Sequence, residues 1–165
     1  MDSNASRRGF TLIEIVLVLA IAGLLLIIVF LAVSGAQRAR RDHQRKDDLS
    51  EFLAATVEYS GNNGQKEPTA PAQLDFIMTN FKHADPSTGV TYVADFYNAG
   101  ATHNLVPPIG HIAYAERHVC AADGTPSAPD DILADPPNYG IPTLRKFAVW
   151  TTLETGGTAC LTGEF

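Results

Sequence analysis

The sequence predicts an α+β protein in which one long amino-terminal helix, membrane-spanning in its first half, packs on a small antiparallel sheet of three or four strands. An unbroken apolar run extends from Ile15 to Val33. No proline occurs between Met1 and Glu67, so a helix that starts in this run can continue far beyond it. The later part of the chain contains short stretches in which apolar and polar residues alternate, as they do in half-buried strands.

The apolar run is long enough to cross a lipid bilayer as a helix. Its nineteen residues contain no polar side chain, and at about 1.5 Å per residue they span nearly the ~30 Å hydrocarbon core. A helix that is apolar on every face must be covered by lipid or by protein. It is a permanent membrane anchor, a secretory signal peptide cut near Ser34–Ala36, or a helix that moves from lipid into a protein assembly. The apolar region of a typical signal peptide is shorter, about 7–15 residues, which argues against the second interpretation.

Beyond this run the chain has the pattern of an amphipathic helix. Side chains that can be buried recur every three or four residues: Leu49, Phe52, Leu53, Thr56 and Val57. They predict a face that packs on the rest of the chain, and the stretch SGNNG at Ser60–Gly64 predicts the helix end. The polar face carries mixed charges, which indicate a solvated surface or salt links to other copies of the chain: Asp42, Arg45, Lys46, Asp47, Asp48 and Glu51.

The remainder is expected to begin with a short helix and then to form the sheet. The short helix is predicted at Gln73–Lys82, because the apolar residues of that stretch share one face. A turn follows at Asp85–Gly89. The alternating stretches then predict the strands: Val90–Tyr97, Ile112–Cys120, Lys146–Leu153 and a short last strand at Thr158–Thr162.

Charge and motif content narrow the classes of function. The formal net charge is −6 over the whole chain and again −6 from Gly61 onward, where five basic residues face eleven acidic ones. This balance argues against nonspecific binding of nucleic acid, and we predict no direct contact with it. The sequence contains no GxSxG, P-loop or GxGxxG pattern, and its five histidines lack the spacing of metal motifs. We therefore expect a protein that is not an enzyme.

Two cysteines, Cys120 and Cys160, are forty positions apart. In an exported domain we expect them to form a disulfide, and closing a loop of that size would stabilise the fold by roughly 4 kcal/mol. The alternative is a pair of buried free thiols. Neither cysteine belongs to a CxxC pattern, which argues against a zinc or redox site.

The residues before the apolar run form a specific pattern. Arg7-Arg8-Gly9 precedes Phe10, and an acid, Glu14, stands at the fifth position counted from that phenylalanine. Together with the apolar helix, this pattern resembles the class III leader junction of type IV pilins and type II secretion pseudopilins. The resemblance implies that a membrane prepilin peptidase cuts between Gly9 and Phe10 from the cytoplasmic side and then N-methylates Phe10.

The resemblance also implies a role for Glu14, whose ionised carboxylate would cost roughly 2.5–3.5 kcal/mol in hydrocarbon. Cleavage creates an α-ammonium group on Phe10, which in a filament would face Glu14 of a neighbouring copy. At about 4 Å and an effective dielectric constant near 20, their attraction is roughly 4 kcal/mol, and desolvation offsets much of it. We therefore expect the pair to set the register between copies, while packing of apolar helices supplies most of the cohesion.

By this resemblance the chain is a structural subunit of a type IV pilus-like filament with three parts: a cleaved leader at residues 1–9, a long helix at 10–60 with its transmembrane segment at 10–33, and a globular pilin-like head at 61–165. Its partners would be other copies of itself, prepilin peptidase, an inner-membrane assembly platform and, before assembly, membrane lipid. The precursor would cross the cytoplasmic membrane once with its amino terminus in the cytoplasm, and the assembled fibre would lie at the cell surface.

Two other functions stay open. Many pilins carry a proline in the second half of this helix, where Leu31 stands here, so a pseudopilin of a type II secretion or competence system also fits. The alternative from a different class is a monomeric membrane-anchored adhesin or binding module. Four arginines and a lysine follow the apolar run within fifteen residues, and the positive-inside rule alone would favour the opposite orientation.

Calcium is the one cofactor for which the sequence offers ligands. Some pseudopilins bind calcium in a loop on the carboxyl side, and the proline-rich stretch after Cys120 contains weak candidates: Asp123, Asp130, Asp131 and Asp135. Their spacing does not match an EF-hand. A solvated acidic loop is the simpler interpretation, and we otherwise expect no cofactor.

Overall fold

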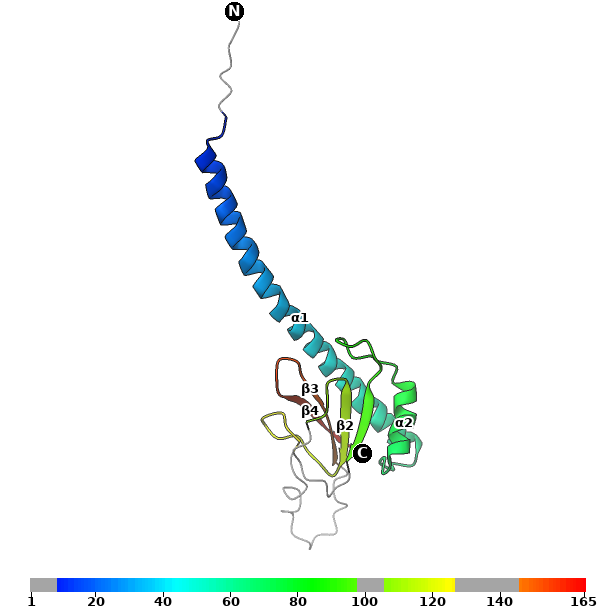
Figure 1. The fold of residues 1–165 in the computed structure, drawn as a ribbon. Coiled ribbons are helices and arrows are strands. Elements are labelled where there is room, and N and C mark those ends of the chain that lie inside the picture. The colour runs from blue at the N-terminus through cyan, green and yellow to red at the C-terminus, as the bar shows by residue number, and fades with distance from the viewer. Residues whose placement is uncertain (1–8, 98–105, 127–145) are drawn as a thin grey trace, which may run out of the picture. The chain divides into compact units, whose positions relative to one another are not determined.

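The computed structural model describes residues 9–97, 106–126 and 146–165. Within these ranges the chain forms two helices and four strands (Figure 1): α1 (Leu12–Asn62), α2 (Pro71–Asn80), β1 (Val93–Tyr97), β2 (His111–Glu116), β3 (Lys146–Thr152) and β4 (Thr158–Glu164). The expected α+β class is confirmed, with a long amino-terminal helix and a four-stranded sheet.

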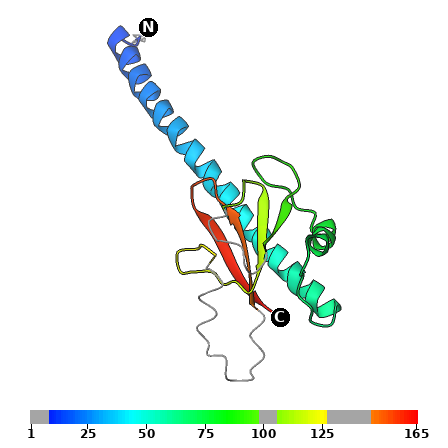
Figure 2. The same ribbon diagram turned by 60° about the horizontal axis from the view of Figure 1, so that its bottom comes forward.

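The chain divides into two units, Met1–Gln37 and Arg38–Phe165. In the described part of the first unit, the apolar side chains of α1 are exposed. The second unit contains the rest of α1, α2 and the sheet. Within this second unit, α1 crosses one face of the sheet and α2 lies beside β1 (Figure 2).

The sheet is mixed, with the strand order β1-β2-β3-β4. The pairs β2–β3 and β3–β4 are antiparallel as expected, but β1 runs parallel to β2, with Val93 opposite His111. The expectation of a fully antiparallel sheet is therefore wrong for β1. Both strands start at the same end of the sheet, where the Val93 N–H donates a hydrogen bond of 3.1 Å to the Gly110 carbonyl. Alternation of residues predicts the faces of a strand and leaves its direction open.

The first two predicted strands are shorter than expected for local reasons. β1 begins at Val93, because Val90 accepts a hydrogen bond from the Asp85 N–H and closes the preceding turn. β2 ends at Glu116, because Arg117 adopts a positive φ of 57°, which breaks the extended conformation.

One hydrophobic core lies between the sheet and the helices. Its buried members come from both helices, from the residue after α2, from the segment that precedes β1, and from the strands β2 and β3. They are Leu49, Phe52, Leu74, Ile77, Phe81, Tyr92, Ile112, Tyr114, Phe147 and Val149. The predicted packing face of α1 is thus confirmed at Leu49 and Phe52, whereas Val57 stays 37% exposed. The other sheet face buries small side chains around Trp150, which stacks on Tyr97 at a ring distance of 5.5 Å.

Candidate functional site

The start of α1 is held by a contact between Thr11 and Glu14. Thr11 precedes the first helical residue, Leu12, and so occupies the N-cap position. Its N–H donates a hydrogen bond of 2.8 Å to Glu14 Oε2, and its hydroxyl donates one of 2.9 Å to the same oxygen. This is the glutamate half of a capping box, which satisfies a backbone donor that the helix leaves unpaired. This role of Thr11 was not predicted from the sequence, although the spacing T-x-x-E from Thr11 to Glu14 is its signal.

The expected cleavage site lies just outside the helix. Gly9 and Phe10 are exposed and have no helical or strand conformation. Phe10 is 84% exposed, and a Cβ atom placed on Gly9 would meet no heavy atom within 4 Å. The Gly9–Phe10 peptide bond is therefore in irregular, accessible backbone one residue before the cap. Cleavage there and methylation of Phe10 stay predictions.

The following part of α1 exposes apolar side chains around the helix. Its large side chains from Leu12 to Val33 are between 46% and 84% exposed. An eighteen-residue window of α1 has a mean hydropathy of 3.4, and by length and composition the helix can cross a membrane. An amino-terminal helix of this kind is what a membrane-anchored precursor requires.

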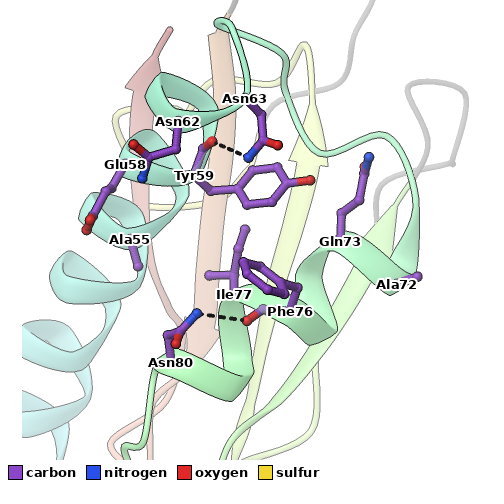
Figure 3. Close-up of a pocket in the computed structure, with 10 residues that line it drawn as sticks. All are labelled: Ala55, Glu58, Tyr59, Asn62, Asn63, Ala72, Gln73, Phe76, Ile77 and Asn80. Atoms are coloured by element: carbon purple, nitrogen blue, oxygen red, sulfur yellow. Dashed lines mark hydrogen bonds between the residues drawn. The ribbon is translucent and has the colours of Figure 1, made fainter.

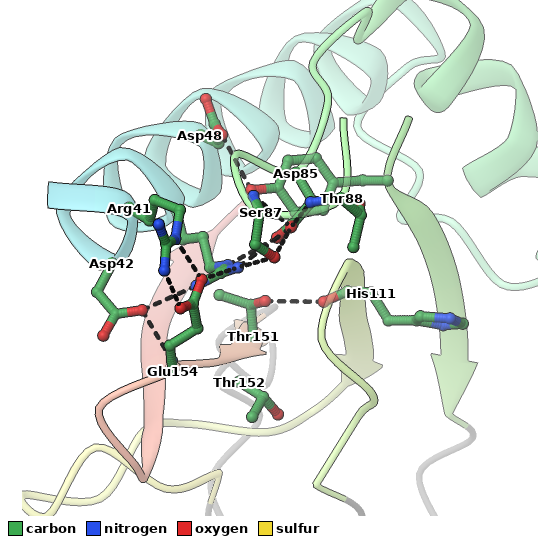
Figure 4. Close-up of polar contacts among 12 residues, drawn as sticks. Arg41, Asp42, Asp48, Asp85, Ser87, Thr88, His111, Thr151, Thr152 and Glu154 are labelled. Atoms are coloured by element: carbon green, nitrogen blue, oxygen red, sulfur yellow. Dashed lines mark hydrogen bonds and ion pairs between the residues drawn. The ribbon is translucent and has the colours of Figure 1, made fainter. Parts of the chain in front are cut away.

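In the second unit, a buried ion-pair network surrounds Arg45 of α1. Its partners Asp42, Asp85 and Glu154 are labelled in Figure 4. The Arg45 guanidinium donates from Nε to Asp85 Oδ2 at 2.7 Å and from Nη2 to Asp85 Oδ1 at 3.1 Å. It also donates to Asp42 Oδ1 at 2.9 Å and to Glu154 Oε1 at 3.0 Å. One guanidinium thus connects α1 to the turn before β1 and to the turn between β3 and β4.

A second set of bonds reinforces the link to the β3–β4 turn. Asp42 accepts hydrogen bonds from the backbone N–H groups of Glu154 and Thr155 at 2.8 and 3.0 Å, and from the Thr155 hydroxyl at 2.6 Å. The Arg41 guanidinium donates two hydrogen bonds to the Glu154 carboxylate, from Nε at 2.7 Å and from Nη2 at 2.6 Å. Two adjacent charged residues of α1, Arg41 and Asp42, therefore both bind the β3–β4 turn.

The network determines the charge states of its members. Burial alone would raise the pKa of Asp85, but hydrogen bonds from Arg45 and Ser87 outweigh it and hold that pKa well below its usual value. Burial opposes the charge on Arg45 as well, and its bonds to Asp85 and Glu154 outweigh that effect and raise its pKa. Asp85 and Arg45 therefore both remain ionised at neutral pH.

A neighbouring contact ties α1 to the segment that enters β1. Asp48 accepts a hydrogen bond of 3.0 Å from the Tyr92 hydroxyl, and its other oxygen lies 3.0 Å from His83 Nδ1. Burial, together with the Asp48 charge, raises the pKa of Tyr92. The expectation of a solvated polar face on this part of α1 is therefore wrong for Asp42, Arg45 and Asp48, because the folded chain itself supplies their partners.

The structure joins Cys120 and Cys160 in a disulfide, as the sequence analysis expected. Of the candidate calcium ligands, Asp123 accepts hydrogen bonds from the N–H and hydroxyl of Thr125 at 2.9 and 2.6 Å. Asp130, Asp131 and Asp135 lie outside the described residues. Among the residues that are described, no group of three or more His, Cys, Asp or Glu side chains is placed to hold a metal ion.

Residues 4–30 match the family model described as the prokaryotic N-terminal methylation motif. This motif is the class III prepilin leader and is typical of type IV pilins and pseudopilins, so the resemblance seen in the sequence is confirmed over these residues. It supports a precursor of the type IV pilin or pseudopilin type. No curated protein and no solved structure matches the chain.

Proposed function

We propose that this protein is the structural subunit of a type IV pilus-like surface filament. The observation that supports it is a coincidence of two features in one segment. Residues 4–30 carry the N-terminal methylation motif, and the same segment begins a helix whose apolar side chains are exposed around its circumference. Lipid covers such a helix in a membrane-bound precursor, and the helices of other copies cover it in a filament.

Maturation starts at the exposed backbone before the cap. Prepilin peptidase cuts the Gly9–Phe10 bond on the cytoplasmic side and N-methylates Phe10, which becomes residue one of the mature subunit. The new α-ammonium group lies one residue before Thr11, and it is mostly charged at neutral pH because its reference pKa is about 7.7–8.0.

The Glu14 carboxylate then has two roles. Its Oε2 atom accepts both bonds from Thr11 and so starts the helix. Its Oε1 atom accepts no hydrogen bond from any of the described residues and is left for the ammonium group of a neighbouring copy. Because the cap fixes the side chain, less conformational entropy is lost when the pair between copies forms.

The precursor spans the cytoplasmic membrane once, with its amino terminus inside and the second unit outside. A disulfide in the second unit agrees with an oxidising compartment. An assembly platform in the inner membrane transfers the subunit from lipid to the filament, where heterologous packing that does not close produces a helical fibre. The role is structural and not catalytic.

The mature amino terminus and the neighbouring genes both test this function. Mass spectrometry of the native protein is expected to find a mature chain that begins with N-methylphenylalanine at Phe10. An intact leader would instead favour a monomeric anchored binding module. A secretion or competence pseudopilin would share the mature terminus, and genes for a secretin with exported hydrolases beside this gene would indicate that role.

Substitutions of Glu14 separate its two roles. In Glu14→Gln the side chain keeps an acceptor for Thr11 and loses the charge, whereas Glu14→Ala loses both. Both variants are expected to yield few sheared surface fibres. Wild-type fibre yield from Glu14→Gln would contradict the charge pairing and leave only the helix cap.

A further inference from the structure

A cleft of about 610 Å³ opens between the last turns of α1 and the short helix α2 (Figure 3). It belongs to the second unit and is separate from both the methylation motif and the Arg45 network. Residues of the two helices line it from opposite sides. A volume of this order is typical of sites that hold a small organic ligand.

Two aromatic rings contribute to the apolar part of the cleft lining. Tyr59 of α1 and Phe76 of α2 lie with their ring centroids 6.0 Å apart and their planes inclined by 58°. Phe76 is 61% exposed, although it sits beside the buried Ile77. An exposed phenylalanine next to a hollow offers a ring face to a ligand at little cost, because the ring is already in water.

The polar residues of the lining are mostly amides. Asn63 and Asn80 each donate one hydrogen bond to a helix carbonyl, at 2.8 and 3.3 Å, and each keeps its amide oxygen free within the described structure. Gln73 uses its oxygen to cap α2, where it accepts a bond of 3.1 Å from the Ala70 N–H. Its NH₂ group and the Tyr59 hydroxyl have no partner among the described residues, so donors and acceptors both remain for a ligand.

The charge of the lining excludes several ligand classes. Among the described residues that line the cleft, none is basic, and Glu58 is the acidic one. Phosphates and other anions would lack a cation there. A purely apolar ligand would leave the amides without hydrogen bonds. The lining suits a neutral molecule that has both a C–H face and several hydroxyl groups.

We propose that this cleft binds a neutral oligosaccharide. The C–H face of one sugar ring packs on Phe76, and the Tyr59 ring borders it. The sugar hydroxyls exchange hydrogen bonds with the Gln73 amide, the Asn63 oxygen and the Glu58 carboxylate. This activity does not depend on filament assembly, because every group that takes part lies in the second unit of a single chain.

The test uses the full chain in a zwitterionic detergent, because the headgroups of glycoside detergents would compete for the cleft. Maltotriose, cellotriose and triacetylchitotriose are titrated in turn, and binding is followed by saturation-transfer NMR and calorimetry. At least one of the three is expected to bind saturably. Phe76→Ala is expected to weaken that binding about tenfold, the loss of one ring contact.

Two further variants keep the result interpretable. Glu58→Ala removes an exposed carboxylate of α1 that the proposal assigns to the sugar hydroxyls, and it is expected to weaken binding without altering the fold. Thr79→Ala lies on α2 outside the cleft lining and is expected to bind as the wild type does. Failure of all three sugars to bind, or equal binding by wild type, Phe76→Ala and Glu58→Ala, would overturn the proposal. Either result leaves the filament function untouched, since that is measured by the mature terminus and fibre yield.

Discussion

Arg45 and Asp85 form a buried bidentate ion pair in which neither side chain is exposed to solvent. The pair joins the middle of α1 to the turn before β1, forty residues away. Ser87 completes it, because its N–H and hydroxyl donate to the Asp85 oxygen that also accepts from Arg45 Nη2. Buried charges are tolerated only when their hydrogen-bonding capacity is satisfied in this way.

Removing Arg45 is expected to destabilise the second unit strongly. Arg45→Met leaves Asp85 and Asp42 buried without their cation, and the free energy of unfolding should fall by about 3–5 kcal/mol. Urea unfolding followed by the fluorescence of the buried Trp150 measures the change. Arg40→Met is the matched control, because Arg40 is exposed on the same helix. It should lower the free energy of unfolding by less than about 0.5 kcal/mol. Equal effects of the two substitutions would contradict the burial of the pair.

The network makes stability fall in acid. The pKa values of Asp85, Asp42 and Glu154 are all lowered in the folded protein: hydrogen bonds to Asp85 and Asp42 outweigh burial, and the bond from Arg41 is the main cause for Glu154. Lowered folded-state values mean that the contribution is complete above the ordinary carboxyl pKa of about 4 and is lost as the pH falls through the folded-state values.

We therefore expect the urea midpoint to decline progressively below about pH 4. Asp85→Asn removes the group with the largest lowering of pKa and should make that decline shallower, even though the variant starts from a lower midpoint. A decline of unchanged steepness in Asp85→Asn would show that other carboxyl groups are responsible.

The disulfide is expected to contribute to stability through the unfolded chain. Because its cysteines are forty positions apart, replacing both with serine should lower the free energy of unfolding by about 4 kcal/mol in the chain-entropy treatment. The loss is measured by comparing the thermal unfolding of the double variant with that of the oxidised and the reduced wild type. A double variant as stable as the oxidised protein would refute the expectation.

Gly163 on β4 is required because the Phe147 ring covers it. A Cβ atom at this position would lie 2.2 Å from a carbon atom of the Phe147 ring. The Phe165 ring stacks on the Phe147 ring, with the two ring centroids 4.4 Å apart. Gly163→Ala should therefore destabilise the sheet by about 1–3 kcal/mol. Gly61→Ala is the control, since its Cβ meets nothing within 4 Å in a helical segment and should be neutral or stabilising by up to about 1 kcal/mol. Differential calorimetry distinguishes the two outcomes.

Local patterns in the sequence predicted much of this fold. Leu49 and Phe52 were assigned to the packing face from their helical spacing, which depends only on neighbours along the chain. The motif around Gly9, Phe10 and Glu14 is contiguous and was equally readable. The capping role of Thr11 was not predicted, although the T-x-x-E spacing from Thr11 to Glu14 is a local signal of the same kind.

Long-range partners could not be predicted in the same way. Arg45 resembles any charged residue on a helix surface, and its partners Asp85 and Glu154 lie 40 and 109 positions away. The direction of β1 could not be predicted either, because its pairing with β2 depends on the point at which the chain re-enters the sheet. Burial of charge and strand direction both arise from tertiary contacts that periodicity does not report.

The bond between Cys120 and Cys160 encloses residues 121–159, a stretch that includes all of β3. A single proteolytic nick anywhere inside this ring leaves both fragments covalently joined. Digested protein would therefore run as one band on a gel until a reducing agent is added, and a cut outside the ring would release a fragment at once.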